Sequence, residues 1–213
     1  MPAPGKGDRY HHGDLRAALI NTAIELIGER GVRGFSLAEA SRRLGVAVSA
    51  PYAHFADRDD LLAAVAVRAF ELCHAALIPE MERFSDPADS LAAMARAYVR
   101  FAAGHRPLFE LLYESGVDKA RHPEIEEAER PLDEALQACV RALSAGDDAL
   151  SEDLATAIEA TAYGHAMLLL DSGPAQDEKA IELAAERTAR ATLALVESRR
   201  VLGQPSRHPV ADP

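Results

Sequence analysis

The sequence predicts an all-α protein with about nine helices, arranged as a small three-helix N-terminal domain followed by a larger helical domain. Hydrophobic residues make up 48% of the 213 residues, and Ala and Leu, two strong helix formers, supply most of them. Runs of Val, Ile, Thr and aromatic residues, which would indicate strands, are missing. Apolar residues instead recur every three or four positions, which is the spacing of one helix face.

The N-terminal domain is predicted to cover residues 13–57, after a flexible polar arm at 1–12. Its first helix begins near Asp14, because an aspartate is a good N-cap. It stops at Gly31, because glycine commonly follows the last helical residue.

Two very short helices follow, joined by a tight turn. The second helix begins at Ser36, where the S-x-x-E pattern with Glu39 predicts a capping box, and it ends at Gly45. The third covers about 48–55 and carries Pro51 in its first turn, where a missing N–H costs little. This pair predicts a helix-turn-helix.

The larger domain is predicted to span 58–202, with a flexible tail at 203–213. Asp, Ser and Pro at helix starts and Gly or Pro at breaks define six helices. Ser151 is the expected start of the fifth of these, and Pro131 is expected to kink or split the fourth. The six ranges are 57–84, 87–104, 108–114, 123–144, 151–171 and 177–200.

Charge is unevenly distributed along the chain. The 34 Asp and Glu outnumber the 23 Lys and Arg, which gives a net charge of -11. The first sixty residues hold as many basic as acidic side chains, so the rest of the chain carries the whole acidic excess. A locally basic face is therefore compatible with an acidic protein.

Several classes of protein are not expected. Cys73 and Cys139 are far apart and lack metal-ligand spacing, so neither a disulfide framework nor a metal site is predicted. The opening residues are polar and rich in Gly and Pro, unlike a signal peptide, and no apolar run reaches the roughly 18 residues of a membrane span. We expect a cytoplasmic protein with no membrane contact and no cofactor.

The stretch 31–65, GVRGFSLAEASRRLGVAVSAPYAHFADRDDLLAAV, resembles the DNA-binding domain of the TetR family. The family pattern is matched in register by the following residues: Gly31, Ser36, Leu37, Glu39, Arg42, Arg43, Gly45, Val46, Tyr52, His54, Phe55, Arg58, Leu61 and Leu62. The segments 10–16 (YHHGDLR) and 97–109 (AYVRFAAGHRPLF) resemble one subgroup of the family. That subgroup carries a Trp-His-Gly motif, which is degenerate here because the chain has no Trp and Tyr163-Gly164 stands in its place.

The resemblance implies that the third helix enters the major groove of DNA. This helix has no Arg, Asn or Gln, so direct base readout is expected to be sparse and shape readout to contribute. Affinity must then come mainly from phosphate contacts. The predicted DNA-binding residues are Ser36, Arg42, Ala47, Val48, Ser49, Tyr52, His54 and Arg58, together with Lys6 and Arg9 on the arm.

The remaining helices are expected to dimerise and to bind a ligand. Small side chains follow one face of each of the last two helices, and the resemblance favours a homodimer, although an intramolecular core is the alternative. The predicted interface residues are Ile158, Thr161, His165, Leu168, Ala184, Thr188, Ala191 and Leu195. The predicted pocket residues are Phe70, His74, Met94, Tyr98, Phe101, Phe109, Tyr113, Tyr163 and Met167.

The resemblance thus implies a ligand-responsive repressor that binds a palindromic operator as a homodimer and is released by a small organic molecule. An enzyme is not expected, because no phosphate-binding Gly loop, nucleophile elbow or H-E-x-x-H pattern occurs. Glu124, Glu126, Glu127 and Glu129 near His122 could hold a metal, but a solvated helix start is the preferred interpretation. The alternative function is a helical protein-interaction module that has lost DNA binding.

Overall fold

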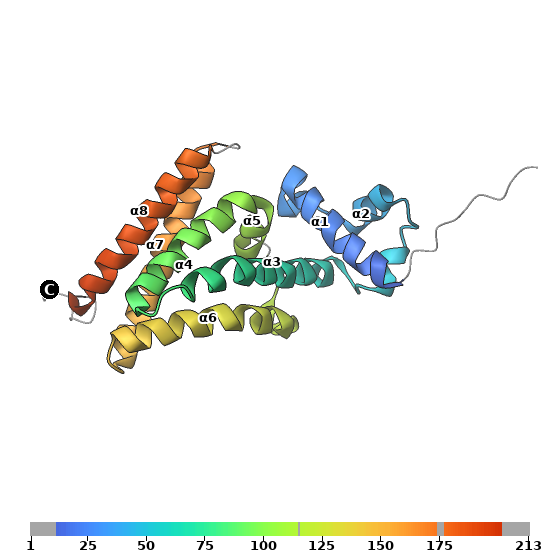
Figure 1. Cartoon of the computed structure of the whole chain (residues 1–213). Coiled ribbons are helices and arrows are strands. Elements are labelled where there is room, and N and C mark those ends of the chain that lie inside the picture. Colours follow the sequence, from blue (N-terminus) through green and yellow to red (C-terminus); the bar gives the residue numbers. More distant parts are fainter. Residues whose placement is uncertain (1–11, 115, 174–176, 202–213) are drawn as a thin grey trace, which may run out of the picture. The chain divides into compact units, whose positions relative to one another are not determined.

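The computed structural model describes residues 12–114, 116–173 and 177–201, and these residues are all-helical, as the sequence predicts (Figure 1). They form eight α-helices and three short 3-10 helices, with no strand in the described ranges. The α-helices are α1 (His12–Gly34), α2 (Leu37–Leu44), α3 (Arg58–Met81), α4 (Pro87–Gly104), α5 (Arg106–Glu114), α6 (Pro123–Leu143), α7 (Asp148–Asp171) and α8 (Glu178–Glu197). The 3-10 helices are η1 (Ala50–Ala53), η2 (Lys119–Arg121) and η3 (Arg199–Val201).

The chain divides into two compact units. Of the described residues, unit 1 contains 12–69 and 107–126, and unit 2 contains 70–106 and 127–201. Unit 1 therefore includes the predicted helix-turn-helix, the first half of α3, most of α5 and the segment that leads into α6.

Helix ends follow the capping residues in the sequence. The Ser36 hydroxyl oxygen accepts from the Glu39 amide at 3.3 Å and starts α2. Gly45 ends α2 in the left-handed region at φ 68°, where its N–H bonds to the carbonyls of Arg42 and Ser41. Gly31, at φ 70°, interrupts α1 where the sequence predicts a stop.

Three expectations about helices need correction. The third helix is a 3-10 helix of four residues, because Pro51 cannot donate to the Ala47 carbonyl and Ala50 bonds to it instead at 2.9 Å. The helix expected at 151 starts at Asp148, because Asp147 caps it by accepting from the Leu150 amide at 3.1 Å. Helix α6 is not split at Pro131, which lies inside one continuous helix.

The core of unit 1 is aliphatic. Leu19 and Leu26 of α1 are completely buried, as are Leu61 and Leu62 of α3. Arg16 lies over the ring of the buried Phe55, with 5.4 Å between the guanidinium carbon and the ring centroid. This contact packs the residue that follows the helix-turn-helix against α1.

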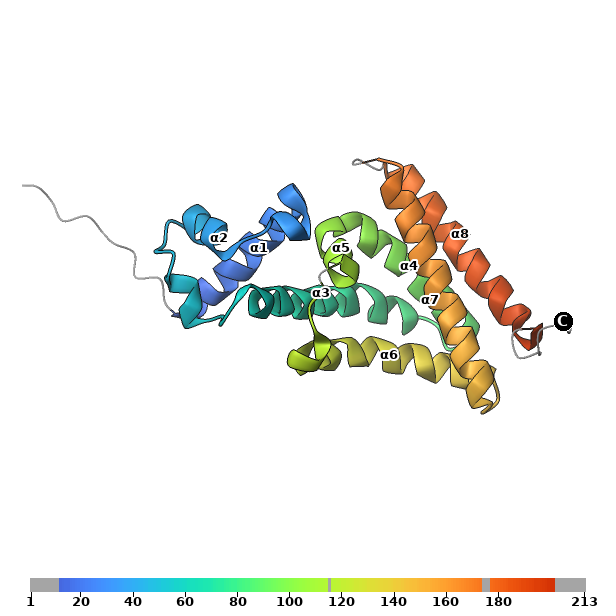
Figure 2. The same cartoon turned by 180° about the vertical axis from the view of Figure 1, so that it is seen from behind.

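In unit 2, α8 packs against both α4 and α7, and the three helices lie side by side in the two opposite views (Figure 1, Figure 2). Two ion pairs join α4 to α8. Arg96 meets Glu186 at 2.7 Å, and Arg100 holds both carboxylate oxygens of Glu182 at 2.8 and 2.6 Å. These bonds fix the register of α8 along α4.

Helix α3 is long and apolar enough to cross a membrane by length and composition. The same pattern arises in a core helix of a folded domain. Leu61, Leu62 and Val65 are completely buried in unit 1, and Leu77 is 1% exposed in unit 2. The apolar character of α3 is thus accounted for by burial of its first half in the core of unit 1 and of its second half in the core of unit 2.

Candidate nucleic-acid interface

The turn between α2 and α3 presents an exposed surface. Val48 and Tyr52 are 59% and 57% exposed, which is unusual for large apolar and aromatic side chains, and Ala47 and Ser49 are also exposed. In the same segment Pro51 is buried. One side of the turn is therefore anchored, and the other offers a methyl-rich surface with hydroxyl groups.

Ion pairs hold α2 against α1. Arg43 donates to both carboxylate oxygens of Glu29 at 2.8 and 2.6 Å, and this hydrogen bond lowers the pKa of Glu29. Glu39 pairs with Arg30 of α1 at 3.2 Å and with Arg42 in its own helix. Arg42 is nevertheless 71% exposed, so its guanidinium remains accessible, whereas Arg43 is committed to α1.

Arg58, at the start of α3, is tied to the backbone of unit 1. Its guanidinium donates to the Val32 carbonyl at 2.6 Å and to the Phe35 carbonyl at 3.3 Å. It also lies 5.9 Å from the centroid of the Phe35 ring. The arginine expected to contact phosphate thus closes the junction between α1 and α2, and a DNA contact from it stays a prediction.

The other predicted DNA-binding residues have mixed positions. Ser36 uses its side-chain oxygen to cap α2, at the N-terminal end where anions are favoured. His54 is half-buried directly after η1. Lys6 and Arg9 lie outside the described residues. Sequence reasoning had no signal for the backbone bonds of Arg58, because they join residues more than twenty positions apart.

Comparison with known proteins supports the nature of this surface. Residues 19–65 match the model of the bacterial regulatory proteins of the tetR family, and residues 91–192 match the tetracyclin repressor-like C-terminal domain. The two matches together span more than half of the chain. The chain belongs to the TetR family. It is a DNA-binding transcriptional regulator with the N-terminal helix-turn-helix and helical C-terminal domain of that family.

Solved structures show the same fold. A protein with unknown function from Rhodococcus sp. RHA1 is 30% identical, with a TM-score of 0.63, and the match covers 86% of this chain and 97% of that one. The TetR family regulator PfmR from Thermus thermophilus is 20% identical, with a TM-score of 0.62 and coverage of 84% and 96%. RolR, solved without ligand, is 26% identical, with a TM-score of 0.58 and coverage of 89% and 97%, and it has also been solved with resorcinol. None of the curated proteins matched the chain.

The residues predicted to line a ligand pocket are divided between the two units of this TetR-family protein. Phe109 and Tyr113 belong to unit 1, where their rings pack at 5.1 Å and Tyr113 is 53% exposed. The other seven belong to unit 2. Met94 and Phe101 are part of its main core cluster, and Tyr98 packs against that cluster. The remaining members are Phe70, which is buried, and His74, Tyr163 and Met167, which are half-buried.

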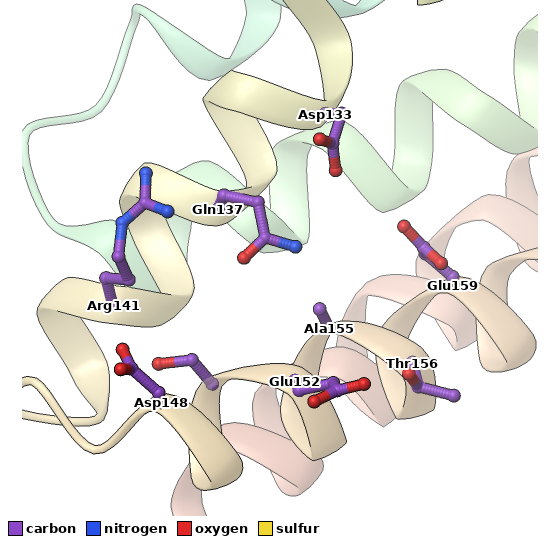
Figure 3. Close-up of a pocket in the computed structure, with 9 residues that line it drawn as sticks. Asp133, Gln137, Arg141, Asp148, Glu152, Ala155, Thr156 and Glu159 are labelled. Atoms are coloured by element: carbon purple, nitrogen blue, oxygen red, sulfur yellow. The ribbon is translucent and has the colours of Figure 1, made fainter. Parts of the chain in front are cut away.

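A polar groove of about 380 Å³ lies between α6 and α7 in unit 2 (Figure 3). Figure 3 shows Asp133 and Glu159 at one end of the groove, and Arg141 and Asp148 at the other. Burial, followed by the nearby carboxylates of Asp133 and Glu129, raises the pKa of Glu159. None of the predicted ligand residues lines this groove, so it is a different feature from the predicted apolar pocket.

The residues predicted for the dimer interface also separate into two groups. Ile158 and Thr188 are completely buried within the chain, where they have no surface to offer a partner. The intramolecular alternative therefore describes these two positions. Leu168 is 73% exposed. The remaining five predicted interface residues are half-buried: Thr161, His165, Ala184, Ala191 and Leu195.

The sequence offered the acidic cluster near His122 as an alternative metal site. Within the described ranges, no group of three or more His, Cys, Asp or Glu side chains is placed to hold a metal ion. His122 is buried and faces the carboxylates of Glu124 and Asp60, with 3.3 and 3.8 Å from its Nδ1 atom.

Proposed function

We propose that this chain is a ligand-responsive repressor that binds a palindromic operator as a homodimer and is released by a small organic molecule. The observation that carries the proposal is the exposed surface of Val48, Ser49 and Tyr52, on a turn whose other side packs against α1 and α2. A contiguous exposed surface with apolar and aromatic side chains marks an interaction site, whereas a single exposed side chain does not.

DNA recognition is proposed to combine few base contacts with many phosphate contacts. Val48 and Ala47 offer methyl groups suited to the thymine methyl, and Ser49 offers a hydroxyl to a base edge. Tyr52, His54, Arg42 and Ser36 are the proposed phosphate donors within the described residues. Lys6 and Arg9 on the arm, and Arg58 if DNA draws it from its carbonyl partners, complete the proposed set.

Dimerisation is proposed to use the outer faces of α7 and α8. A Cβ atom added at Gly164 would meet nothing within 4 Å, so the missing side chain serves no contact inside the chain. Leu168 lies one turn further along α7 and is 73% exposed, and Leu183 of α8 is 47% exposed. A small residue one turn from an exposed leucine is typical of a face that a partner helix approaches closely.

The effector is proposed to bind among the aromatic and sulfur-containing side chains of unit 2. Met94, Tyr98 and Phe101 are gathered in one cluster with the buried residues of α3, α6 and α7. Burial lowers the pKa of the nearby His74, which keeps its imidazole neutral and able to donate or accept a hydrogen bond. RolR, which shares this fold, has been solved with resorcinol. A small, uncharged aromatic molecule is therefore the first class of effector to screen.

A binding titration tests the DNA-binding part of the proposal. The purified protein would be titrated against short duplexes from the region upstream of its own gene, at two salt concentrations. We expect tight binding to one palindromic fragment, a steep loss of affinity with salt, and a large loss in Tyr52→Ala. Phe84→Ala, which removes an aromatic side chain that is 41% exposed in unit 2, is the matched control and should bind as the unchanged protein does.

Affinity that does not change with salt, with no duplex preferred, would contradict the proposal and favour the protein-interaction module.

The coupling between effector and operator binding has its own test. By thermodynamic linkage, an effector that weakens operator binding must itself bind more weakly, by the same factor, when operator is present. An effector affinity that does not change with operator would rule out release by that molecule.

A further inference from the structure

A short segment between α5 and α6 contacts the N-terminal turn of α3 within unit 1. This segment, residues 118–124, contains η2 and the first residues of α6. It lies inside the match to the C-terminal domain model, at 91–192, and far outside the DNA-binding match at 19–65. It nevertheless belongs to the same compact unit as the helix-turn-helix.

His122 is the buried anchor of this segment. Its side chain is 5% exposed, and its Nδ1 atom lies 3.3 Å from a Glu124 oxygen and 3.8 Å from an Asp60 oxygen. Its backbone is fixed as well, because its N–H donates to the Lys119 carbonyl at 3.1 Å and its carbonyl accepts from Ile125 at 3.0 Å. The Nδ1 atom is thus within hydrogen-bond distance of Glu124 in its own segment, and it lies in polar contact with the Asp60 carboxylate of α3.

Asp60 connects His122 to the turn at 55–57, which follows η1 and is called the recognition turn. Its second carboxylate oxygen, Oδ2, accepts from the Ala56 amide at 2.7 Å. Ala56 directly follows Phe55, whose own amide bonds to the Pro51 carbonyl in η1 at 3.0 Å. A single carboxylate therefore joins the turn that ends η1 to His122.

A second, more exposed contact lies beside the first. Arg121 meets Asp57 at 3.6 Å, with the two side chains 60% and 47% exposed. Asp57 caps α3 by accepting from the amides of Asp59 and Asp60 at 2.9 and 3.0 Å. These backbone hydrogen bonds, and to a smaller extent Arg121, lower the pKa of Asp57. The Arg121 pair alone is weak, because exposed pairs are screened by water. His122 makes the more buried of the two contacts with α3.

We propose that residues 118–124 form a clamp that fixes the recognition turn at 55–57, with His122 and Arg121 as positioning residues for DNA recognition. The clamp acts through Asp60 and Asp57 and does not touch DNA. The DNA consequence rests on the proposed function, whereas the clamp itself does not. The segment thus gives the C-terminal sequence region a direct hold on the recognition element, in addition to the chain connection through α3.

Hydrogen exchange of the full-length protein tests the clamp without DNA. His122→Leu keeps the bulk of the side chain but removes the ring nitrogens. His122→Asn keeps a polar group near the position of Nδ1. We expect the amides of 55–60 to exchange roughly two- to ten-fold faster in His122→Leu, the range expected when one buried polar contact is lost. His122→Asn should restore most of the protection, which loss of packing alone would not allow.

Two further variants keep the test decisive. Arg121→Ala changes an exposed side chain that cannot unfold the core, and it should produce a smaller acceleration in the same peptide. Glu126→Ala, an exposed residue of the same unit with no part in the clamp, should leave that peptide unchanged. Unchanged exchange at 55–60 in both His122→Leu and Arg121→Ala would overturn the proposal, as would equal acceleration in Glu126→Ala.

The DNA arm separates positioning from direct contact. If His122 and Arg121 act by positioning, His122→Leu and Arg121→Ala weaken operator binding but leave binding to unrelated DNA unchanged. If Arg121 touches phosphate itself, both affinities fall and the salt slope drops by about one unit, which would overturn its positioning role. If no operator is bound at all, the proposed function fails, while the exchange experiment still decides on the clamp.

Discussion

Replacing Arg58 with alanine removes two hydrogen bonds that close the junction between α1 and α2. The guanidinium donates to the Val32 carbonyl at 2.6 Å and to the Phe35 carbonyl at 3.3 Å. A hydrogen bond from a charged donor contributes about 1.5–3 kcal/mol. The side chain is 36% exposed, so water replaces part of the loss, and the second bond is long. We therefore expect Arg58→Ala to destabilise unit 1 by about 2 kcal/mol.

Hydrogen exchange over residues 32–45 of the full-length protein measures this loss. A destabilisation of about 2 kcal/mol accelerates exchange through opening of unit 1 by roughly 30-fold, since each 1.4 kcal/mol is a factor of ten. Arg58→Lys, whose ammonium can reach one carbonyl, should lose about half as much free energy. Arg42→Ala is the control, because Arg42 is 71% exposed and its pair with Glu39 should be worth less than about 1 kcal/mol.

Protection in Arg58→Ala equal to that of the unchanged protein would refute this reasoning, as would equal losses in Arg58→Ala and Arg42→Ala. The result also decides how DNA-binding data on Arg58 are interpreted. If the junction opens as expected, a loss of operator binding in Arg58→Ala reports a disordered helix-turn-helix rather than a missing phosphate contact.

Three other predictions concern unit 2. Burial raises the pKa of the Cys73 thiol to about 12, and it raises the pKa of the Cys139 thiol by less, so at pH 8 the Cys73 thiolate is roughly a thousand-fold rarer than in an ordinary thiol. Treatment with iodoacetamide followed by peptide mass spectrometry should therefore find Cys139 modified first. Early modification of Cys73 would contradict its buried position. Gly164→Ala should stabilise α7 by up to about 1 kcal/mol, because alanine has the higher helix propensity and its Cβ atom would meet nothing within 4 Å. Gly164→Arg should dissociate the proposed dimer, as measured by analytical ultracentrifugation. A dimer that survives this substitution would exclude the Gly164 face of α7 as the interface. A hydrogen bond from Arg100 lowers the pKa of Glu182, so the stabilisation is present above the usual Glu range and is lost as pH falls through the lowered value. Glu182→Gln should therefore destabilise the protein at pH 7 by at most about 1 kcal/mol, and the resulting decrease in melting temperature should become smaller as pH falls below the usual Glu range. A decrease that does not depend on pH would argue against the ion pair.

Most helices could be predicted because the signals are local. Ser36 and Gly45 bound α2, where the Glu39 amide bonds to a side chain three residues away, and Pro87 begins α4. The cap at Asp147, which starts α7, was missed. The form of η1 was missed, although Pro51 supplied the signal. A proline near a helix start is tolerated, but in so short a helix it removes one of the few available i to i+4 bonds.

The surface and core roles were harder to predict because they depend on contacts distant in sequence. The pattern of small residues on α7 and α8 marked helix faces that contain buried positions. It did not separate Ile158 and Thr188, which face into the chain, from Leu168, which faces out. Nor did the pattern around His122 indicate its contact with Asp60, which lies sixty residues earlier and approaches it only in the folded unit.

Photo-crosslinking from position 52 tests the central claim most directly, because it asks whether the exposed recognition surface touches DNA. The photoreactive residue p-benzoylphenylalanine would replace Tyr52, which is 57% exposed, and in a separate protein would replace Phe84, which is 41% exposed in unit 2. We predict a salt-sensitive crosslink to operator DNA from position 52 and none from position 84. Tight operator binding with no crosslink from position 52, or equal crosslinking from both positions, would contradict the assignment of this surface as the DNA-reading element.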